Sequence, residues 1–402
     1  MKKNIAILAF VLCTLLTLTN VSFGKEIKVL GSFALTGSAG AMPEFGWGFV
    51  DGIDYINKNG GINGKPVKGL LEDMRYDVPT GVAIFTRYAA SEPANELLMA
   101  AGSMTGIIKA LIDKVNIEQK IPWVDASYST EIFGPEGGPA KYPYYFSMGA
   151  TYGDQMKVLL KWIKQDFKGQ GNPKIALVYS PTEWGRDPLA MGRDFAKKTG
   201  VDIVAEEEVT FTATDVTTQV TNVRRSGAKY LIFHGYAGGT PVTPIFLKTA
   251  KQFLKDVTIL GTHYTTVLST FLSAGEAAEG MIGTACLPMT HDVDNPGVKL
   301  FRELAKQNKR ESKDFWPYLQ SLNYVLLMKE AMIRADKAGE LTREGMKKAL
   351  ENLTWDFNGV FEGKSFSYKS HTIPMVRLYK AQAKENKWQP IGEWINVNEE
   401  FK

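Results

Sequence analysis

The sequence predicts an α/β protein with two doubly wound parallel-sheet lobes, and three features of the chain support this fold class. From Glu26 onward, short apolar runs alternate with amphipathic stretches of helix length. The alternation forms two successive series, each typical of a parallel sheet with helices on both faces. No low-complexity linker and no long internal repeat divides the two series. Two sheets without a flexible tether indicate a hinge made of several short crossings of the chain.

The first series predicts strands that alternate with helices. Strands are expected in its apolar segments, at residues 27–34, 65–73, 96–102 and 121–126. Helices are expected between them, at residues 43–57, 79–90 and 105–116. The glycines of NKNGG are typical of a helix end and close the first of these helices.

The second series begins after YPYYFSMGA and repeats the pattern. Its strands are expected at residues 174–180, 201–209, 229–235 and 257–262. Its helices are expected at residues 152–167, 186–198, 215–225 and 240–253. Later segments change character, with helices at 315–337 and 342–352 and with β spacing and turn signals over 359–382. In open sheets of this kind, ligands bind beyond the carboxyl ends of the strands, so two facing lobes would surround one cleft with their loops.

Residues 1–24 predict a cleavable signal peptide. Two lysines precede an apolar run over residues 5–19, and small residues at 22 and 24 suit a signal peptidase that cuts before Lys25. The run is too short to span a membrane comfortably, so the mature protein is expected to be exported and soluble. Cys13 offers an alternative lipid anchor, but Leu12 precedes it where such sites want a small residue.

The mature chain is expected to contain no internal disulfide and no nucleic-acid surface. Loss of Cys13 leaves Cys286 alone, in a run typical of a small buried apolar residue. The net charge of the full chain is only +4, and FRELAKQNKRESKD alternates in sign like the solvated face of a helix.

The sequence offers no convincing nucleotide, nucleophile or metal motif, so we expect no cofactor and no catalytic site. The glycines at 46, 48 and 52 have the wrong spacing for a pyrophosphate loop and lie within the first expected helix, where they favour close helix packing. Residues 226–229 match S-x-x-K at a helix end, where a turn and cap explain them. The four histidines are scattered, and no paired metal-ligand motif occurs.

Small hydroxyl side chains follow two strands of the first series. Ser103 and Thr105 stand at the start of an expected helix, whose free N–H groups suit an anion. Ser127 and Ser129 follow the next strand. Capping of a helix N-terminus is enough to explain the hydroxyl residues of either loop taken by itself. Two such loops on adjacent strands favour capture of a carboxylate.

Large aromatic side chains follow strands of the second series. Trp184, Tyr236, His263 and Tyr264 lie in loops beyond the expected buried strands. Aromatic residues at such loop tips favour contact with a ligand over a place in the core.

These stretches together resemble the type I periplasmic binding proteins, in particular the branched-chain amino acid (leucine/isoleucine/valine) receptors of ABC importers. The resemblance covers residues 26–402 and rests on several segments, of which GFVDGIDYINKNGGINGKPVKGLLED is the most specific. The others are IKVLGSFALTGSAGAM, AGSMTGII, IPWVDAS, KIALVYSPTEWGRD and AEGMIGTACLPMT.

The resemblance implies a set of ligand contacts at matching positions. The first lobe would bind a ligand carboxylate through Thr105, Ser127 and Ser129. The walls would come from Met42 in the first loop, from Trp184 and Tyr236 in the second lobe, and from an aromatic residue of the late helical segment near Tyr318.

One position departs from the family pattern. Amino-acid receptors of the family pair the ligand ammonium with an acidic residue where His263 stands here. An unpaired ammonium in a closed cleft is costly, which disfavours a standard aliphatic amino acid. His263 is a candidate donor to a second ligand acceptor, while Glu183 or Asp187 remains a candidate for the acidic role. The hypothesis is a carboxylate with an aromatic or bulky apolar group.

The resemblance implies an organisation and a role. Lobe 1 would comprise residues 25–148 and 286–375, and lobe 2 residues 149–285 and 376–402, joined by crossings near Met148, Cys286 and Met375. The expected protein is a periplasmic, monomeric solute-binding protein that closes on a small ligand and delivers it to the permease subunits of an ABC importer. A sensory module and an exported α/β enzyme are the alternatives.

Overall fold

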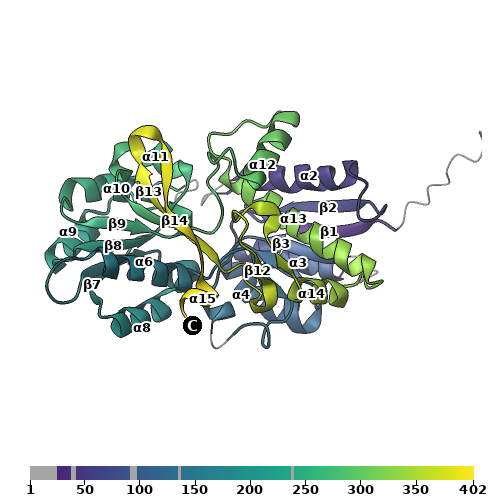
Figure 1. Cartoon of the computed structure of the whole chain (residues 1–402), viewed down its shortest axis with the longest axis horizontal. Helices are drawn as coiled ribbons and strands as arrows, with labels where there is room; N and C mark the ends of the chain where they lie inside the picture. The colour runs from purple at the N-terminus through teal and green to yellow at the C-terminus, as the bar shows by residue number, and fades with distance from the viewer. Residues whose placement is uncertain (1–24, 38–41, 91–96, 135–136, 237–239) are drawn as a thin grey trace, which may run out of the picture.

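The computed structural model describes residues 25–37, 42–90, 97–134, 137–236 and 240–402, and these form two lobes side by side (Figure 1). The predicted signal peptide and Cys13 lie outside the described residues. Each lobe is built on one main sheet with helices on both faces. The α/β fold class with two mostly parallel sheets is therefore confirmed.

The sheet of the first lobe is parallel throughout, in the order β2-β1-β3-β4-β5. Its strands are β1 (Ile27–Phe33), β2 (Val67–Asp73), β3 (Leu97–Gly102), β4 (Trp123–Asp125) and β5 (Tyr145–Ser147). On one face lie α2 (Pro43–Lys58), α12 (Pro296–Gln307), α13 (Trp316–Lys337) and α14 (Arg343–Glu351). On the other face lie α3 (Val78–Ala90) and α4 (Thr105–Asp113). Helices from opposite ends of the sequence thus cover one sheet (Figure 1).

The expected close packing at the glycines of α2 is present, and the partner is α13. A Cβ atom added to Gly48 would lie 2.2 Å from Ser321 Oγ and 2.3 Å from the carbonyl oxygen of Tyr318. A Cβ added to Gly52 would lie 3.0 Å from the side chain of Val325. The glycines therefore set the separation of the two helices.

The sheet of the second lobe is mixed, in the order β14-β13-β10-β9-β8-β6-β7. Its parallel part comprises β6 (Lys174–Tyr179), β7 (Asp202–Glu208), β8 (Tyr230–His234), β9 (Thr258–Gly261) and β10 (Ile282–Ala285). The strands β13 (Met375–Gln382) and β14 (Lys387–Asn396) form an antiparallel hairpin at its edge. One face packs on α9 (Thr217–Ser226), α10 (Val242–Phe253) and α11 (Leu268–Ala274). The other packs on α6 (Tyr152–Asp166) and α8 (Leu189–Thr199).

Several local details differ from the sequence expectations. The second sheet is not wholly parallel, because a tight 3-10 turn over Ala383–Glu385 lets β13 and β14 pair as a hairpin. The helix expected at 186–198 begins later, as α8 at Leu189 with Pro188 as its N-cap, and a separate short helix, α7 (Glu183–Arg186), precedes it. The helix expected at 105–116 is α4 followed by a π-helical turn over Lys114–Glu118. The short strands β5 and β10 were not predicted.

Three short segments of chain connect the two sheets. They follow β5, follow β10 and precede β13. The first and third run side by side, since Ser147 N donates to the carbonyl oxygen of His371 at 2.7 Å. The first and second also pack together, because a Cβ on Gly149 would lie 2.8 Å from Cys286 Cβ. Cys286 is fully buried, as its sequence context indicated. These positions agree with the three predicted crossings, while the exact lobe boundaries stay a prediction.

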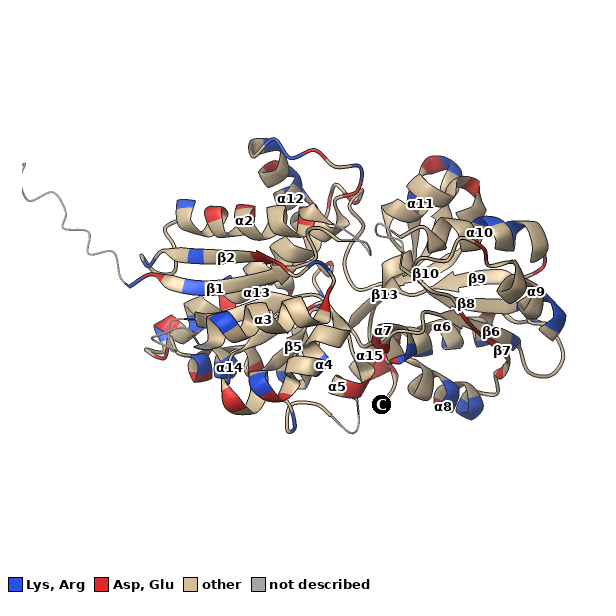
Figure 2. Cartoon of the chain, turned by 180° about the vertical axis from the view of Figure 1, so that it is seen from behind, with Lys and Arg blue, Asp and Glu red and all other residues tan. Residues whose placement is uncertain are grey.

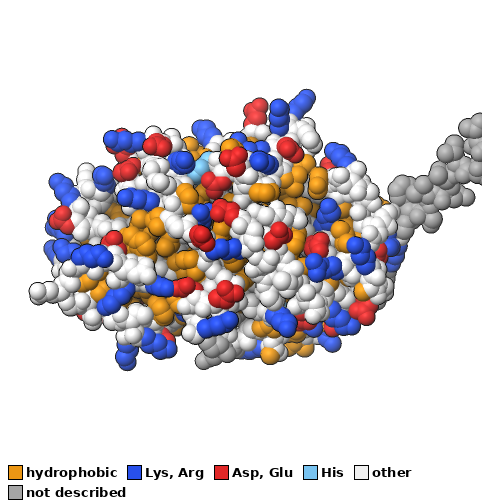
Figure 3. Space-filling view, in the orientation of Figure 1, with side chains coloured by type: hydrophobic (Ala, Val, Ile, Leu, Met, Phe, Trp, Pro, Cys, Tyr) orange, Lys and Arg blue, Asp and Glu red, His pale blue; other side chains and the backbone are white. Residues whose placement is uncertain are grey.

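The surface carries mixed charge. Lysine and arginine side chains alternate with acidic ones over the face shown in Figure 3. In the part of the chain that the structure describes, no helix combines the length and the apolar character that a membrane crossing requires.

Candidate functional site

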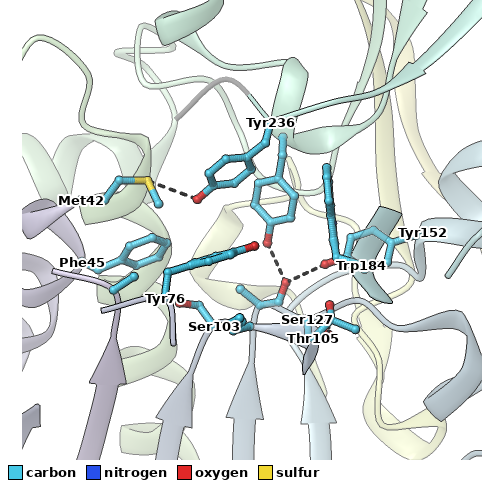
Figure 4. Close-up of a pocket in the computed structure, with 13 residues that line it drawn as sticks. Met42, Phe45, Tyr76, Ser103, Thr105, Ser127, Tyr152, Trp184 and Tyr236 are labelled. Carbon is cyan, nitrogen blue, oxygen red and sulfur yellow. Dashed lines mark hydrogen bonds between the residues drawn. The ribbon is translucent and has the colours of Figure 1, made fainter. Parts of the chain in front are cut away.

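A cavity of about 30 Å³ lies between the two lobes, beyond the carboxyl ends of both sheets (Figure 4). Both lobes supply its walls. The lining residues are Ala34, Met42, Phe45, Tyr76, Ser103, Met104, Thr105, Ala126, Ser127, Tyr152, Trp184, Tyr236 and Tyr264. A volume of this size holds about one water molecule. A larger ligand therefore requires the lobes to move apart and close again around it.

The first lobe supplies a polar floor to the cavity. Ser103 and Thr105 follow β3, and Ser127 follows β4. The hydroxyl oxygens of Thr105 and Ser127 lie 2.7 Å apart and share a hydrogen bond. Thr105 also begins α4, so the first N–H groups of that helix, which have no partner within the helix, lie at the cavity. Hydroxyl groups at the positive end of a helix dipole form a suitable site for a carboxylate.

A buried carboxylate, Asp125, holds this floor in place. One oxygen accepts a 2.6 Å hydrogen bond from Ser127 N, and the other accepts one of 2.8 Å from Trp123 Nε1. Burial raises the pKa of Asp125 to about 7, against the lowering effect of these hydrogen bonds. The side chain does not line the cavity, so its role is to orient the loop that carries Ser127.

The second lobe supplies an aromatic wall. The ring centroids of Tyr236 and Tyr264 lie 6.0 and 6.3 Å from that of Trp184, and that of Tyr152 lies 6.2 Å away. Two hydroxyls of the wall reach the first lobe: Tyr264 donates to the carbonyl oxygen of Ala126 at 2.6 Å, and Tyr236 lies 3.4 Å from the sulfur of Met42 (Figure 4). The buried Nε1 of Trp184 has no acceptor among the described residues. An acceptor atom on a ligand would satisfy it.

His234 supports the aromatic wall from behind. Its ring lies 4.2 Å from that of Trp184, and its nitrogens contact Thr262 Oγ1 at 2.7 Å and the carbonyl oxygen of Trp184 at 3.2 Å. Burial lowers the pKa of His234 from 6.5 to about 3. The neutral ring is thus the form that the folded protein accommodates.

A pH dependence of stability follows from His234. The pKa of His234 is lower in the folded than in the unfolded protein. The neutral ring therefore contributes fully to the free energy of unfolding above pH 6.5, and this contribution is lost as the pH falls toward 3. At pH 5 the loss is about 2 kcal/mol relative to pH 7. We expect His234→Gln to remove this part of the pH dependence when the free energy of unfolding is measured by urea denaturation at both pH values. Other buried groups, such as Asp125, affect the original protein and the variant equally, so the difference between the two reports His234. An equal pH dependence of the free energy of unfolding in both proteins would contradict the lowered pKa of His234.

The cavity lining contains no ionisable acid, lysine, arginine or histidine. The stretches 38–41 and 237–239, which lie outside the described residues, contain none in their sequence either. Within the described ranges, no cluster of three or more histidine, cysteine or acidic side chains is arranged to hold a metal ion. The described lining therefore supplies dipoles and aromatic faces to a ligand and no full charge.

Five of the eight residues proposed from the sequence line this cavity. They are Met42, Thr105, Ser127, Trp184 and Tyr236. The structure does not place the other three, Ser129, His263 and Tyr318, at its surface.

Tyr318 faces away from the cavity. Its hydroxyl donates to Asp51 Oδ2 at 2.8 Å, and Asp51 also pairs with Arg310. Residues two apart on a helix point about 200° apart, so α13 cannot turn both Trp316 and Tyr318 toward the second lobe. Trp316 is the one that does so, with its ring 5.7 Å from that of Tyr264. The aromatic residue that this segment turns toward the second lobe is therefore Trp316, two positions before the expected Tyr318.

Ser129 connects the lobes instead of lining the cavity. It caps the short helix α5 (Thr130–Phe133) by accepting from Ile132 N, and its hydroxyl donates to Asp187 Oδ2 at 2.5 Å. Asp187 also accepts from Thr130 N at 2.5 Å. Asp187 was a candidate partner for a ligand ammonium, but its oxygens are occupied by the first lobe. The other candidate, Glu183, pairs with Lys109 at 3.1 Å and is largely exposed.

His263 lies next to a second, smaller cavity. It is buried, accepts a hydrogen bond from Cys286 N on Nδ1 at 3.2 Å, and packs against the rings of Tyr128 and Tyr264. The Nε2 atom is buried without a partner among the described residues.

Sequence reasoning missed several lining residues. Phe45, Tyr76 and Tyr152 were not proposed, and Tyr264 was noted only as a loop aromatic. Tyr76 follows β2 at the same edge of the sheet as Ser103, so the rule that strand-end loops surround the cleft would have found it. Tyr152 begins the helix directly after the first crossing, and no local pattern marks that position as part of a cleft.

Known proteins match the chain along nearly all of its length. The family model described as periplasmic binding protein matches residues 26–387. A Leu/Ile/Val-binding protein from Citrobacter freundii is 23% identical over 360 residues, which cover 88% of this chain and 93% of that protein. The solved structure of a branched chain amino acid ABC transporter protein from Thermus thermophilus with bound valine superposes with a TM-score of 0.81 at 23% identity and covers 94% of this chain and 98% of that one. A solute-binding protein from R. palustris in complex with 4-hydroxybenzoate superposes with a TM-score of 0.73 at 19% identity and covers 92% and 97%.

Proposed function

Because this chain belongs to the periplasmic binding protein family, as the match over residues 26–387 shows, we propose that it is an exported solute-binding protein of an ABC importer. It captures a small carboxylate-bearing ligand between its lobes and presents the closed form to the permease. Closure is a shift of population driven by ligand contacts with both lobes.

The observation that carries this proposal is the division of the cavity lining between the lobes. The hydroxyls of Thr105 and Ser127 and the start of α4 come from the first lobe, while Trp184 and Tyr236 come from the second. A ligand that contacts both sets stabilises only the arrangement in which the sets face each other. No reaction is needed for this role, and we propose that the chain catalyses none.

The chemistry of the lining favours an acid with an aromatic or bulky apolar group. The hydroxyls and the helix start suit a carboxylate, and the rings of Trp184, Tyr236 and Tyr264 suit a flat or bulky apolar body. An α-amino acid also carries an ammonium, for which the lining offers no carboxylate. The relatives include proteins described with valine and with 4-hydroxybenzoate, so the fold accommodates both classes of ligand.

Identification of the bound solute tests the proposal most directly. We expect mass spectrometry of protein purified under native conditions to detect a small carboxylic acid. Thermal-shift screening against amino acids and aromatic acids should then show stabilisation by the aromatic acids. Stabilisation by leucine or valine alone would contradict the ligand class, and stabilisation by no carboxylate would contradict the function.

The double variant Thr105→Val with Ser127→Ala tests the carboxylate site. We expect the affinity for the identified acid to fall about a hundredfold, because two donors to a charged group are lost. The matched control is Thr249→Val with Ser273→Ala, which removes the same atoms from hydroxyls that bond to their own helices. Unchanged affinity in the first variant, by isothermal titration calorimetry, would rule out this carboxylate site.

A further inference from the structure

A second cavity, of about 20 Å³, lies between the lobes on the side of the chain crossings. Its lining comes from the segments after β9 and β10 and from the start of α13. The residues are His263, Thr266, Val267, Leu268, Ala285, Leu287, Pro288, Met289, Thr290, Trp316 and Leu319. Most of these side chains are apolar, so the cavity is an apolar chamber with few polar groups.

One of the residues that line this chamber, His263, carries a hydrogen-bond donor that lacks an acceptor in the described part of the chain. Because Nδ1 of His263 accepts from Cys286 N, the proton of the neutral ring resides on Nε2. Burial lowers the pKa of His263 to about 3, so the ring is neutral at physiological pH. The Nε2 atom is buried and has no partner among the described residues. Buried donors are rarely left unpaired, because the lost hydrogen bond to water is not replaced.

Aromatic rings that pack on one another line this chamber and the main cavity. The ring centroid of Trp316, which lines the chamber, lies 5.7 Å from that of Tyr264 and 5.6 Å from that of Phe45. Tyr264 and Phe45 both line the main cavity. Tyr264 belongs to the second lobe, whereas Phe45 and Trp316 belong to the first. Separation of the lobes therefore parts Tyr264 from the other two rings.

We infer that the ligand cleft has a second compartment on the crossing side, in which His263 donates a hydrogen bond to an uncharged oxygen at the far end of the ligand. This inference rests on the proposed function and specifies its ligand. The carboxylate lies at Thr105 and Ser127, the apolar body passes the ring of Trp316, and the terminal oxygen reaches Nε2 of His263.

The chamber selects an uncharged group for two reasons. No lysine, arginine or carboxylate lines it, so a second charge on the ligand would be buried without a partner. A neutral hydroxyl or carbonyl oxygen can also accept the hydrogen bond from Nε2 of His263 without bringing a charge into the chamber. The ligand class is thus a monocarboxylate with an apolar body and a terminal hydroxyl or other neutral oxygen.

A series of matched acids tests this compartment. Benzoate, phenylacetate, 3-phenylpropanoate and 4-phenylbutanoate would each be measured by calorimetry with a para-methyl or a para-hydroxyl substituent. The two substituents have similar size, so the difference isolates the hydrogen bond. We expect one chain length at which the hydroxyl acid binds about tenfold more tightly than the methyl acid. The same affinity for both members at every length would overturn the inference.

Two variants assign the preference to the chamber. His263→Phe should abolish the hydroxyl preference, so that the hydroxyl acid and the methyl acid of each length bind the variant with the same affinity. Met289→Trp fills the chamber without touching the bond between His263 and Cys286, and it should reduce binding of the longer acids but not of the benzoates. A hydroxyl preference that survives both variants would also overturn the inference. Failure of these acids and of every other carboxylate in the thermal-shift screen to bind the folded original protein would instead contradict the proposed function itself.

Discussion

Replacement of Lys109 by methionine is expected to weaken ligand affinity about a hundredfold while the protein remains folded. Lys109 lies on α4 of the first lobe, and its ammonium contacts Glu131 at 2.5 Å, Glu183 at 3.1 Å and Asp187 at 3.8 Å. Glu183 and Asp187 belong to the second lobe, so the lysine joins the lobes only when they are closed. Figure 2 shows acidic positions on the ribbons of α5 and α7, near the place where the lobes meet.

The expected loss of ligand affinity comes mainly from the contact of Lys109 with Asp187, and less from its contacts with the two glutamates. The glutamate side chains are mostly exposed, and exposed ion pairs contribute little. The side chain of Asp187 is fully buried, and burial raises its pKa despite the hydrogen bonds from Ser129 and Thr130. Removal of the nearest cation leaves that charge without compensation in the closed state alone, which costs about 3 kcal/mol. Because ligand binding requires closure, the affinity falls by the same free energy.

The measurement is ligand titration of Lys109→Met at pH 8 and pH 5. We expect the loss of affinity to be smaller at pH 5 than at pH 8, because burial raises the pKa of Asp187 and removal of the lysine raises it further, so the lower pH favours the neutral acid. The control is Lys109→Met combined with Asp187→Asn, which removes the buried charge and should recover most of the affinity. An affinity within threefold of the original for the single variant would show that these contacts do not contribute to closure.

Gly48→Ala is expected to destabilise the protein by about 3 kcal/mol, although alanine is the better helix former. The new Cβ would lie 2.3 Å from the carbonyl oxygen of Tyr318, and a backbone atom cannot turn aside as a side chain can. The helices α2 and α13 would have to separate and lose part of the packing that covers the first sheet. Urea denaturation measures the effect.

Gly52→Ala on the same helix provides the comparison. Its added Cβ would meet side chains and no backbone atom, with Val325 at 3.0 Å and Leu322 at 3.1 Å, so we expect a smaller loss than at Gly48. Asp54→Ala, at an exposed position of α2, controls for the change in helix propensity. If Gly48→Ala were as stable as the original protein, the close approach of α2 to α13 would not hold in solution.

The order of the elements and the polar side of the site were predictable from the sequence. Apolar periodicity marks the longer strands and helices because their side chains must alternate between core and solvent. Ser103, Thr105 and Ser127 were found because parallel strands bring their carboxyl ends to one edge of the sheet. The same rule placed Trp184 and Tyr236 in the cleft, and it would also have reached Tyr76.

The contacts between the lobes were decided only by the tertiary structure. The sequence does not say which side of α13 faces the second lobe, so Tyr318 was expected where Trp316 lies. It also does not show that Ser129 meets Asp187, or that His263 faces a chamber beside the crossings. Local patterns report whether a side chain is buried within its own lobe. The partner that a side chain meets across the cleft depends on how the crossings orient two separately built sheets, and no periodicity records that orientation.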